Sequence, residues 1–198
     1  MKALLALALT AYAFAQAPVQ SVPRPYEFKS YERYIYDYNE LLSNRRTKGR
    51  FELIILKKGK EYEVSIEGFY REWSGFVRTK VKDANELAGF ILMKMYFLHH
   101  WLAPLGKTIF SRALVKVLSS GKVDWTPGRK RVDKDLLRLV RSCKYGGLEG
   151  MSLELLKKKE LILKVCASPQ ASLPIYIYRR TSGGDIYEIE LIEYSDLK

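Results

Sequence analysis

"FELIILKKGKEYEVSIEGFYREWSGFVRTKV", residues 51–81, carries the clearest secondary-structure signal in the chain. Val64 and Ile66 alternate with polar residues, which is the two-residue period of a strand with one buried face. Glycine-containing turn signals stand at residues 57–60 and 74–75. The segment therefore predicts two or three antiparallel strands.

A long apolar helix is predicted directly after these strands. Asp83 is a suitable N-cap, and the helix that follows carries "LAGFILMKMYFLHHWLAPLGKT", residues 87–108. A helix that is apolar nearly all round lies in a protein core or spans a membrane. Because Lys94, Pro104 and the two histidines oppose membrane insertion, we expect a core helix.

The only two histidines, His99 and His100, are adjacent in this helix. Their side chains would point about 100° apart, so one metal ion could not easily bind both. We therefore predict no metal site, with His99 as a hydrogen-bonded core residue and His100 at the surface.

Further helices are predicted on both sides of this region. Ser30 would cap a helix that runs to Gly49 with a tyrosine-rich apolar face. Residues 109–118 and 133–144 have helical apolar spacing, and Ser152 would cap a short helix that leads into a strand.

The C-terminus predicts two more strands, in "PIYIYRR" and "IYEIELIEY", joined by the turn "TSGGD". Because runs of strands and runs of helices do not alternate regularly, the predicted fold class is α+β. We expect antiparallel sheet packed against a bundle of three to five helices. A single domain over residues 30–198 is expected, with a subdivision near 103–106 or 122–130 as the alternative.

The N-terminus is typical of a secretory signal peptide. Lys2 precedes an uncharged apolar run from Ala3 to Ala15, and about 13 residues are too few to cross a membrane. Small residues at 13–17 suit a signal peptidase that cleaves before Gln16 or before Pro18. Residues 1–17 are predicted to be the signal peptide and 18–29 to form an extended lead-in. The alternative is a helical N-terminus that packs on the domain.

Composition favours a basic, exported globular protein. The formal net charge is +12 with 28% charged residues, and abundant Lys and Glu with few Asn and Gln are typical of a thermophile. Such charge favours anionic partners, either an envelope polymer or a lipid surface. The alternative is that the lysines only solvate a heat-stable surface.

The densest positive cluster is the predicted anion-binding site. Placed on and before the expected helix at 133–144, it would neutralise phosphates or carboxylates. Its members are Arg129, Lys130, Arg131, Lys134, Arg138 and Arg141.

Cys143 and Cys166 are the only cysteines. In an oxidising compartment they could pair, closing a loop of just over twenty residues and adding about 3 kcal/mol of stability. The alternative is two small buried side chains that never meet.

These features predict a secreted or cell-envelope protein without a catalytic centre, a cofactor or a transmembrane helix in the mature chain. Two alternatives remain. One is a secreted hydrolase with paired carboxylates, for which Glu61, Glu63, Glu67, Glu72 and Asp124 are the candidates. The other is a nucleic-acid-binding protein, which would require that the N-terminus is retained.

Overall fold

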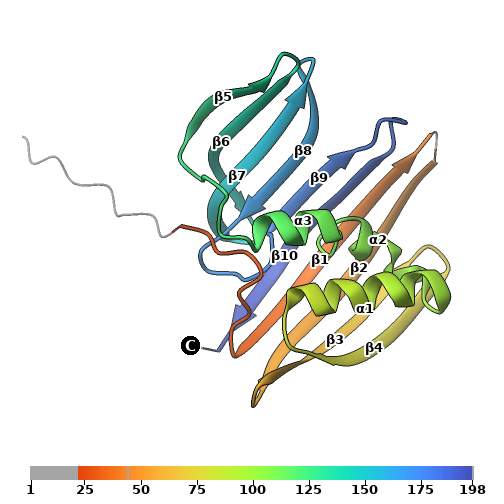
Figure 1. The fold of residues 1–198 in the computed structure, drawn as a ribbon. Coiled ribbons are helices and arrows are strands. Elements are labelled where there is room, and N and C mark those ends of the chain that lie inside the picture. Colours follow the sequence, from red (N-terminus) through yellow and green to blue (C-terminus); the bar gives the residue numbers. More distant parts are fainter. Residues whose placement is uncertain (1–21, 44, 198) are drawn as a thin grey trace, which may run out of the picture.

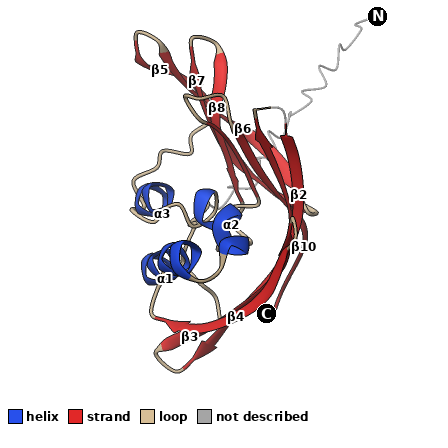
Figure 2. Cartoon of the chain, turned by 90° about the vertical axis from the view of Figure 1, so that its right-hand side faces the viewer, coloured by secondary structure: helices blue, strands red, loops and turns tan. Residues whose placement is uncertain are grey.

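The computed structural model describes residues 22–43 and 45–197. Its main element is one antiparallel sheet of ten strands, in the order β4-β3-β2-β1-β10-β9-β8-β7-β6-β5. The sheet is curved, and the helices lie on its concave face (Figure 2).

Most connections are hairpins, so strands that follow one another in sequence are neighbours in the sheet (Figure 1). The strands are β1 (Tyr31–Leu42), β2 (Arg45–Lys58), β3 (Glu61–Tyr70), β4 (Trp73–Val81), β5 (Gly128–Asp133), β6 (Leu136–Tyr145), β7 (Leu148–Lys157), β8 (Glu160–Ala167), β9 (Tyr176–Arg180) and β10 (Ile186–Asp196). The helical segments are α1 (Ala84–Phe97), the 3-10 helix η1 (His100–Leu102), α2 (Ala103–Lys107) and α3 (Arg112–Leu118).

The predicted fold class is wrong. The chain is dominated by the ten-stranded sheet, and its helical part is α1 with three short segments rather than a bundle of three to five helices. The error arose because three stretches that were expected to be helical are strands.

Residues 30–49 were predicted to form a helix and instead form β1 and the start of β2. Tyr34, Tyr36 and Tyr38 are all buried on the concave side of β1, while Ile35 and Asp37 between them are only partly buried. Tyr34 and Tyr38 are four residues apart, a spacing that fits a helix and a strand equally well. The buried Tyr36 fits only the strand.

Residues 133–144 were also predicted to be helical and form β6 instead, and the helix expected after Ser152 is the second half of β7. Both faces of β6 are partly open, so its burial alternates only weakly. The basic strand β5 lies beside it and exposes all six of its residues. A strand without a clearly buried face lacks the two-residue pattern that identifies it.

Other elements agree with the expectations. The strands at 51–81 are present as β2, β3 and β4, and the C-terminal pair as β9 and β10. The helix begins where predicted, because the Asp83 carboxylate accepts hydrogen bonds from the main-chain N–H groups of Asn85 and Glu86 at 2.8 and 2.9 Å.

The apolar helix is buried on one side only, which corrects the expectation of a fully enclosed core helix. Leu87 and Ile91 of α1 are fully buried, whereas Tyr96 and Phe97 are 68% and 77% exposed. The helix ends at Phe97, before the histidines. His99 is half-buried and His100 is exposed.

The main core lies between the helices and the strands β1 to β4. The Trp101 ring stacks on Phe51 of β2, with 6.3 Å between the ring centroids. Gly75 of β4 leaves room for this indole, since a Cβ atom there would lie 2.6 Å from Trp101 Nε1.

The end of the predicted lead-in packs on the domain. Tyr26 is buried, and its hydroxyl donates a hydrogen bond to the main-chain oxygen of Ile109. The predicted signal peptide, residues 1–17, lies outside the described residues. None of the helices between residues 22 and 197 has the length and apolar character needed for a membrane crossing.

Candidate functional site

The concave face of the sheet changes from apolar to charged toward one rim. Cross-strand partners lie on the same face of a sheet, and they form two rows here. The inner row is formed by Val140, Leu153, Val165, Ile177, Ile189 and Tyr38. The rim row, two residues closer to the hairpin turns, is formed by Arg138, Leu155, Leu163, Arg179, Tyr187 and Glu40.

A pocket of about 310 Å³, which we call the α3 pocket, lies between α3 and both rows. Its apolar wall on α3 is formed by Leu114, Val117 and Leu118. Its apolar wall on the sheet is formed by Leu153, Leu155, Leu163 and Ile177. Figure 1 shows α3 in front of the sheet, between α1 and the strands β5 to β8.

The walls of the α3 pocket are incompletely covered. Val117 is 54% exposed, and Leu114 and Leu163 are only half-buried. Apolar side chains that converge on a cavity and remain open to water are typical of a ligand-binding site.

Four polar residues complete the lining: Lys107, Thr108, Ser111 and Arg179. The Arg179 guanidinium donates a hydrogen bond of 3.2 Å from Nη1 to the main-chain oxygen of Lys107, at the end of α2. The Lys107 ammonium lies 4.8 Å from the centroid of the Tyr187 ring. Tyr187 is the cross-strand partner of Arg179, so the two cationic groups lie toward the rim of a mostly apolar lining.

A buried carboxylate lies next to Lys107. Glu40 is 1% exposed, and its Oε1 is 3.5 Å from the Lys107 Nζ. Its Oε2 accepts hydrogen bonds from Arg71 Nη2 at 2.7 Å and from the Tyr70 hydroxyl. Burial, followed by this hydrogen bond to Glu40, raises the pKa of Tyr70, so the phenol remains a donor.

The predicted basic cluster is divided between the two faces of the sheet. Lys130 and Arg138 are cross-strand partners on the concave side, whereas Arg129 and Arg131 pair with Leu139 and Leu137 on the other side. Lys134 lies in the turn between β5 and β6. The six residues therefore do not form one flank of a helix.

Carboxylates already pair with two members of this cluster. Arg138 Nη2 lies 2.8 Å from Asp124 Oδ2, and this hydrogen bond, with those from Thr126, holds the pKa of Asp124 well below its usual value. Arg141 donates two hydrogen bonds to Glu154, of 2.9 and 2.8 Å.

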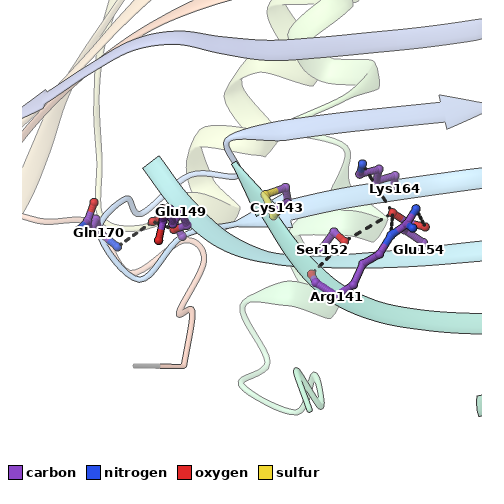
Figure 3. The surroundings of a disulfide bond; sticks show 9 residues. Arg141, Cys143, Glu149, Ser152, Glu154, Lys164 and Gln170 are labelled. Carbon is purple, nitrogen blue, oxygen red and sulfur yellow. Dashed lines mark hydrogen bonds and ion pairs between the residues drawn. A yellow bond between two sulfur atoms is a disulfide. The ribbon is translucent and has the colours of Figure 1, made fainter. Parts of the chain in front are cut away.

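Cys143 on β6 and Cys166 on β8 are joined by a disulfide that spans the intervening strand β7. Figure 3 shows the Glu154 carboxylate beside it, between Arg141 and Lys164. The Lys164 Nζ is 3.6 Å from this carboxylate and lies over the rings of Tyr145 and Tyr176. These contacts tie β6, β7, β8 and β9 together on the convex face.

The carboxylates considered for a hydrolase are not gathered in the α3 pocket. Glu61 begins β3 and Glu72 follows its end, so the strand separates them. Asp124 is paired with Arg138. Among the residues that the structure describes, no group of three His, Cys, Asp or Glu side chains could hold a metal ion.

Comparison with known proteins adds little to this geometry. No protein-family model and no curated protein matches the chain. A domain from Vibrio parahaemolyticus with the provisional name outer membrane lipoprotein-sorting protein domain is 8% identical, over 87% of each chain, with a TM-score of 0.28. A likeness of that size carries no argument about this chain.

Sequence reasoning missed Lys107 and Arg179. Lys107 is a single cation among apolar and small residues, and Arg179 is one of two adjacent arginines at the end of an apolar strand. Only the packing of α2 against the sheet brings the two residues to one pocket. Leu153 and Leu155 have the two-residue spacing of a strand, which would have revealed the apolar wall if β7 had been identified.

Proposed function

We propose that this chain is an exported, non-catalytic binding protein whose α3 pocket takes the apolar chain of a lipid or of a lipid-modified molecule. The observation that carries the proposal is the apolar cavity of about 310 Å³ between α3 and β7 to β9. This volume is at the lower end of the range for small-molecule pockets, about 300–1,000 Å³. It suits a slender alkyl chain better than a bulky ring system.

The open side of the pocket supports the same proposal. A ligand chain would cover the exposed side chain of Val117 and the half-buried side chains of Leu114 and Leu163. Burial of apolar surface yields about 25 cal/mol per Å². The binding energy would therefore come from water exclusion rather than from a specific hydrogen bond.

The proposed location, outside the cytoplasm, rests on the N-terminal sequence. The run from Ala3 to Ala15 and the small residues that follow have the pattern of a cleaved signal peptide. Determination of the mature N-terminus by mass spectrometry tests this part. A chain that retains Met1 to Ala15 inside the cell would overturn the export proposal and favour an intracellular partner.

Pocket binding can be tested with uncharged n-alkanols of increasing length, in competition with a fluorescent fatty acid. If the pocket takes an alkyl chain, each added methylene should tighten binding about fourfold, from about 0.8 kcal/mol per buried CH₂, until the cavity is full. An affinity that does not depend on chain length would contradict the proposal.

A matched pair of variants locates this binding. Leu114→Gln places an amide in the apolar wall and should weaken alkanol binding at least tenfold, because the polar group must be desolvated. Val132→Gln, on the exposed strand β5, lies outside the pocket and should leave the affinity unchanged.

Strand β5 is a second candidate binding surface, for an anionic envelope polymer. Arg129, Lys130 and Arg131 are exposed, and no hydrogen bond or ion pair to a carboxylate is found for them in the described chain. The test is charge reversal at Arg129 and Arg131. If the charge-reversed variant binds an anionic glycan as tightly as the unmodified protein, and with the same salt dependence, this strand has no role in the binding.

A further inference from the structure

Resting on the proposed function, we infer that the α3 pocket is specific for an anionic amphiphile and that Arg179 and Lys107 bind its charged group. The inference names the class of ligand, an alkyl chain that ends in a phosphate or a carboxylate. It follows from the position of the two cations relative to the apolar wall.

Arg179 continues the wall of the pocket. Its cross-strand partner is Leu163, which lines the cavity, and Ile177, two residues before it on β9, lines the cavity as well. Side chains two residues apart on a strand point to the same face. A chain lying along Ile177 and Leu163 therefore reaches Arg179 next.

Most of the hydrogen-bonding capacity of Arg179 remains available. A guanidinium has five N–H donors, and within residues 22–43 and 45–197 the one hydrogen bond of the Arg179 side chain goes to the main-chain oxygen of Lys107. No carboxylate pairs with Arg179 within the described part of the chain, whereas the next residue, Arg180, pairs with Glu160 at 3.1 Å. The planar fork of an arginine suits phosphate and carboxylate oxygens.

Lys107 contributes a second positive charge at the same place. Among the described residues, the one carboxylate that pairs with Lys107 is Glu40, 3.5 Å away, and Glu40 is approached more closely by Arg71, at 2.7 Å. Lys107 and Arg71 thus share a single carboxylate, while Arg179 has no carboxylate partner within the described residues. The end of the pocket retains an excess of positive charge that an anionic ligand would neutralise.

Contacts along the rim of the sheet bring Arg179 and Lys107 near each other. The main-chain oxygen of Lys107 at the end of α2 accepts a hydrogen bond from Arg179, and the Lys107 ammonium lies over the ring of Tyr187, the cross-strand partner of Arg179. Arg179 is exposed and Lys107 is half-buried, so both can reach an anionic group at the mouth of the pocket, in contacts that salt would screen. A cationic head group would be repelled there, and a neutral hydroxyl would accept a weaker hydrogen bond than an anion.

The test compares three ligands with the same alkyl chain: dodecanol, dodecyl phosphate and dodecyltrimethylammonium, with dodecanoate as a second anion. For the unmodified protein at low salt, dodecyl phosphate should bind at least tenfold tighter than dodecanol, and the trimethylammonium compound should bind more weakly than either. The preference for phosphate should decrease as salt is added. Comparison of phosphate with dodecanoate shows which anion fits the site better.

Two variants assign the effect. Arg179→Gln should reduce the preference for phosphate over alcohol to about threefold or less. Arg180→Gln removes a charge of the same type from the adjacent position, outside the pocket lining, and should leave both affinities unchanged. Circular dichroism and a urea unfolding curve for each variant establish that it is folded.

The outcomes separate the two proposals. If dodecanol and dodecyl phosphate bind the unmodified protein equally, the anion site is overturned while the apolar pocket stands. If none of the alkyl ligands binds, the proposed function fails and the anion site fails with it. If Arg180→Gln removes the preference and Arg179→Gln does not, the charged group binds elsewhere.

Discussion

Lys107 of α2 and Glu40 of β1 face each other across the boundary between the helices and the sheet, with 3.5 Å between Nζ and Oε1. Arg71, at the turn between β3 and β4, reaches the other oxygen of the same carboxylate. Glu40 therefore connects three separate parts of the fold. It also sets the electrostatic balance at one end of the α3 pocket.

Glu40→Gln should destabilise the protein by about 2 kcal/mol. Removing one member of a fully buried ion pair costs about 3–5 kcal/mol, and the value here is lower because the Arg71 and Lys107 side chains are 25% and 39% exposed. Urea unfolding measures the change. The control is Glu160→Gln, whose exposed pair with Arg180 should contribute less than about 1 kcal/mol. Equal effects of the two substitutions would contradict the role of Glu40.

Gly75→Ala should destabilise the protein by about 1–3 kcal/mol, the usual cost of an additional methyl group in a filled core. A Cβ atom at Gly75 would lie 2.6 Å from Trp101 Nε1, and the indole would have to move away from Phe51. Thermal unfolding and tryptophan fluorescence report the change. Gly183→Ala is the matched control, because the nearest atom is Thr181 Oγ1 at 3.8 Å, and its stability should be unchanged.

Alkaline pH should unfold the protein cooperatively. Burial raises the pKa of seven tyrosines, Tyr26, Tyr34, Tyr36, Tyr38, Tyr70, Tyr176 and Tyr194. In the unfolded chain a tyrosine ionises near pH 10, so the stability that these groups contribute is complete below that pH and is lost as the pH rises above it.

The measurement is tyrosinate absorbance followed together with circular dichroism during a slow alkaline titration. The seven tyrosines, of which six are buried and Tyr194 is half-buried, should ionise in one step, together with the loss of the fold. A gradual, fully reversible ionisation of every tyrosine near pH 10 in a protein that keeps its fold would show that these side chains are accessible to solvent.

Reduction of the disulfide should lower the free energy of unfolding by about 3 kcal/mol, on the loop-entropy model for the separation of 23 residues between Cys143 and Cys166. Urea unfolding with and without reductant measures the difference. The double variant Cys143→Ala, Cys166→Ala should lose a similar amount and should no longer respond to the reductant. Equal midpoints for the oxidised and reduced proteins would mean that the bridge constrains the unfolded chain very little.

The elements that could be predicted from sequence were those whose apolar residues recur with the spacing of a strand or of a helix, but not with both. The alternation around Val64 and Ile66 and the Asp83 cap correctly located a strand and the start of a helix. The tyrosines of β1 misled because two of the three fit both periods. The strands β5 to β7 misled because β5 and β6 have no continuous buried face.

The candidate site could not be predicted from local sequence patterns, because its residues are far apart in the sequence. Arg179 meets Leu163 and Lys107 only after β8, β9 and α2 have been assembled. Charge density along the sequence pointed instead to residues 129–141, which the sheet distributes over two faces. The density of Lys and Arg along the sequence therefore identified a basic region, but not Lys107 and Arg179, which line the cavity.

Strand β5 forms one end of the sheet and leaves one side of its backbone unpaired, which in many proteins allows a second copy to add its own strand. Here two copies that approached along this border would bring Arg129, Lys130 and Arg131 of each against the same residues of the other. The mutual repulsion opposes growth of the sheet into dimers or filaments at low ionic strength. The arginine and lysine side chains of β5 therefore oppose the association of two molecules along this edge.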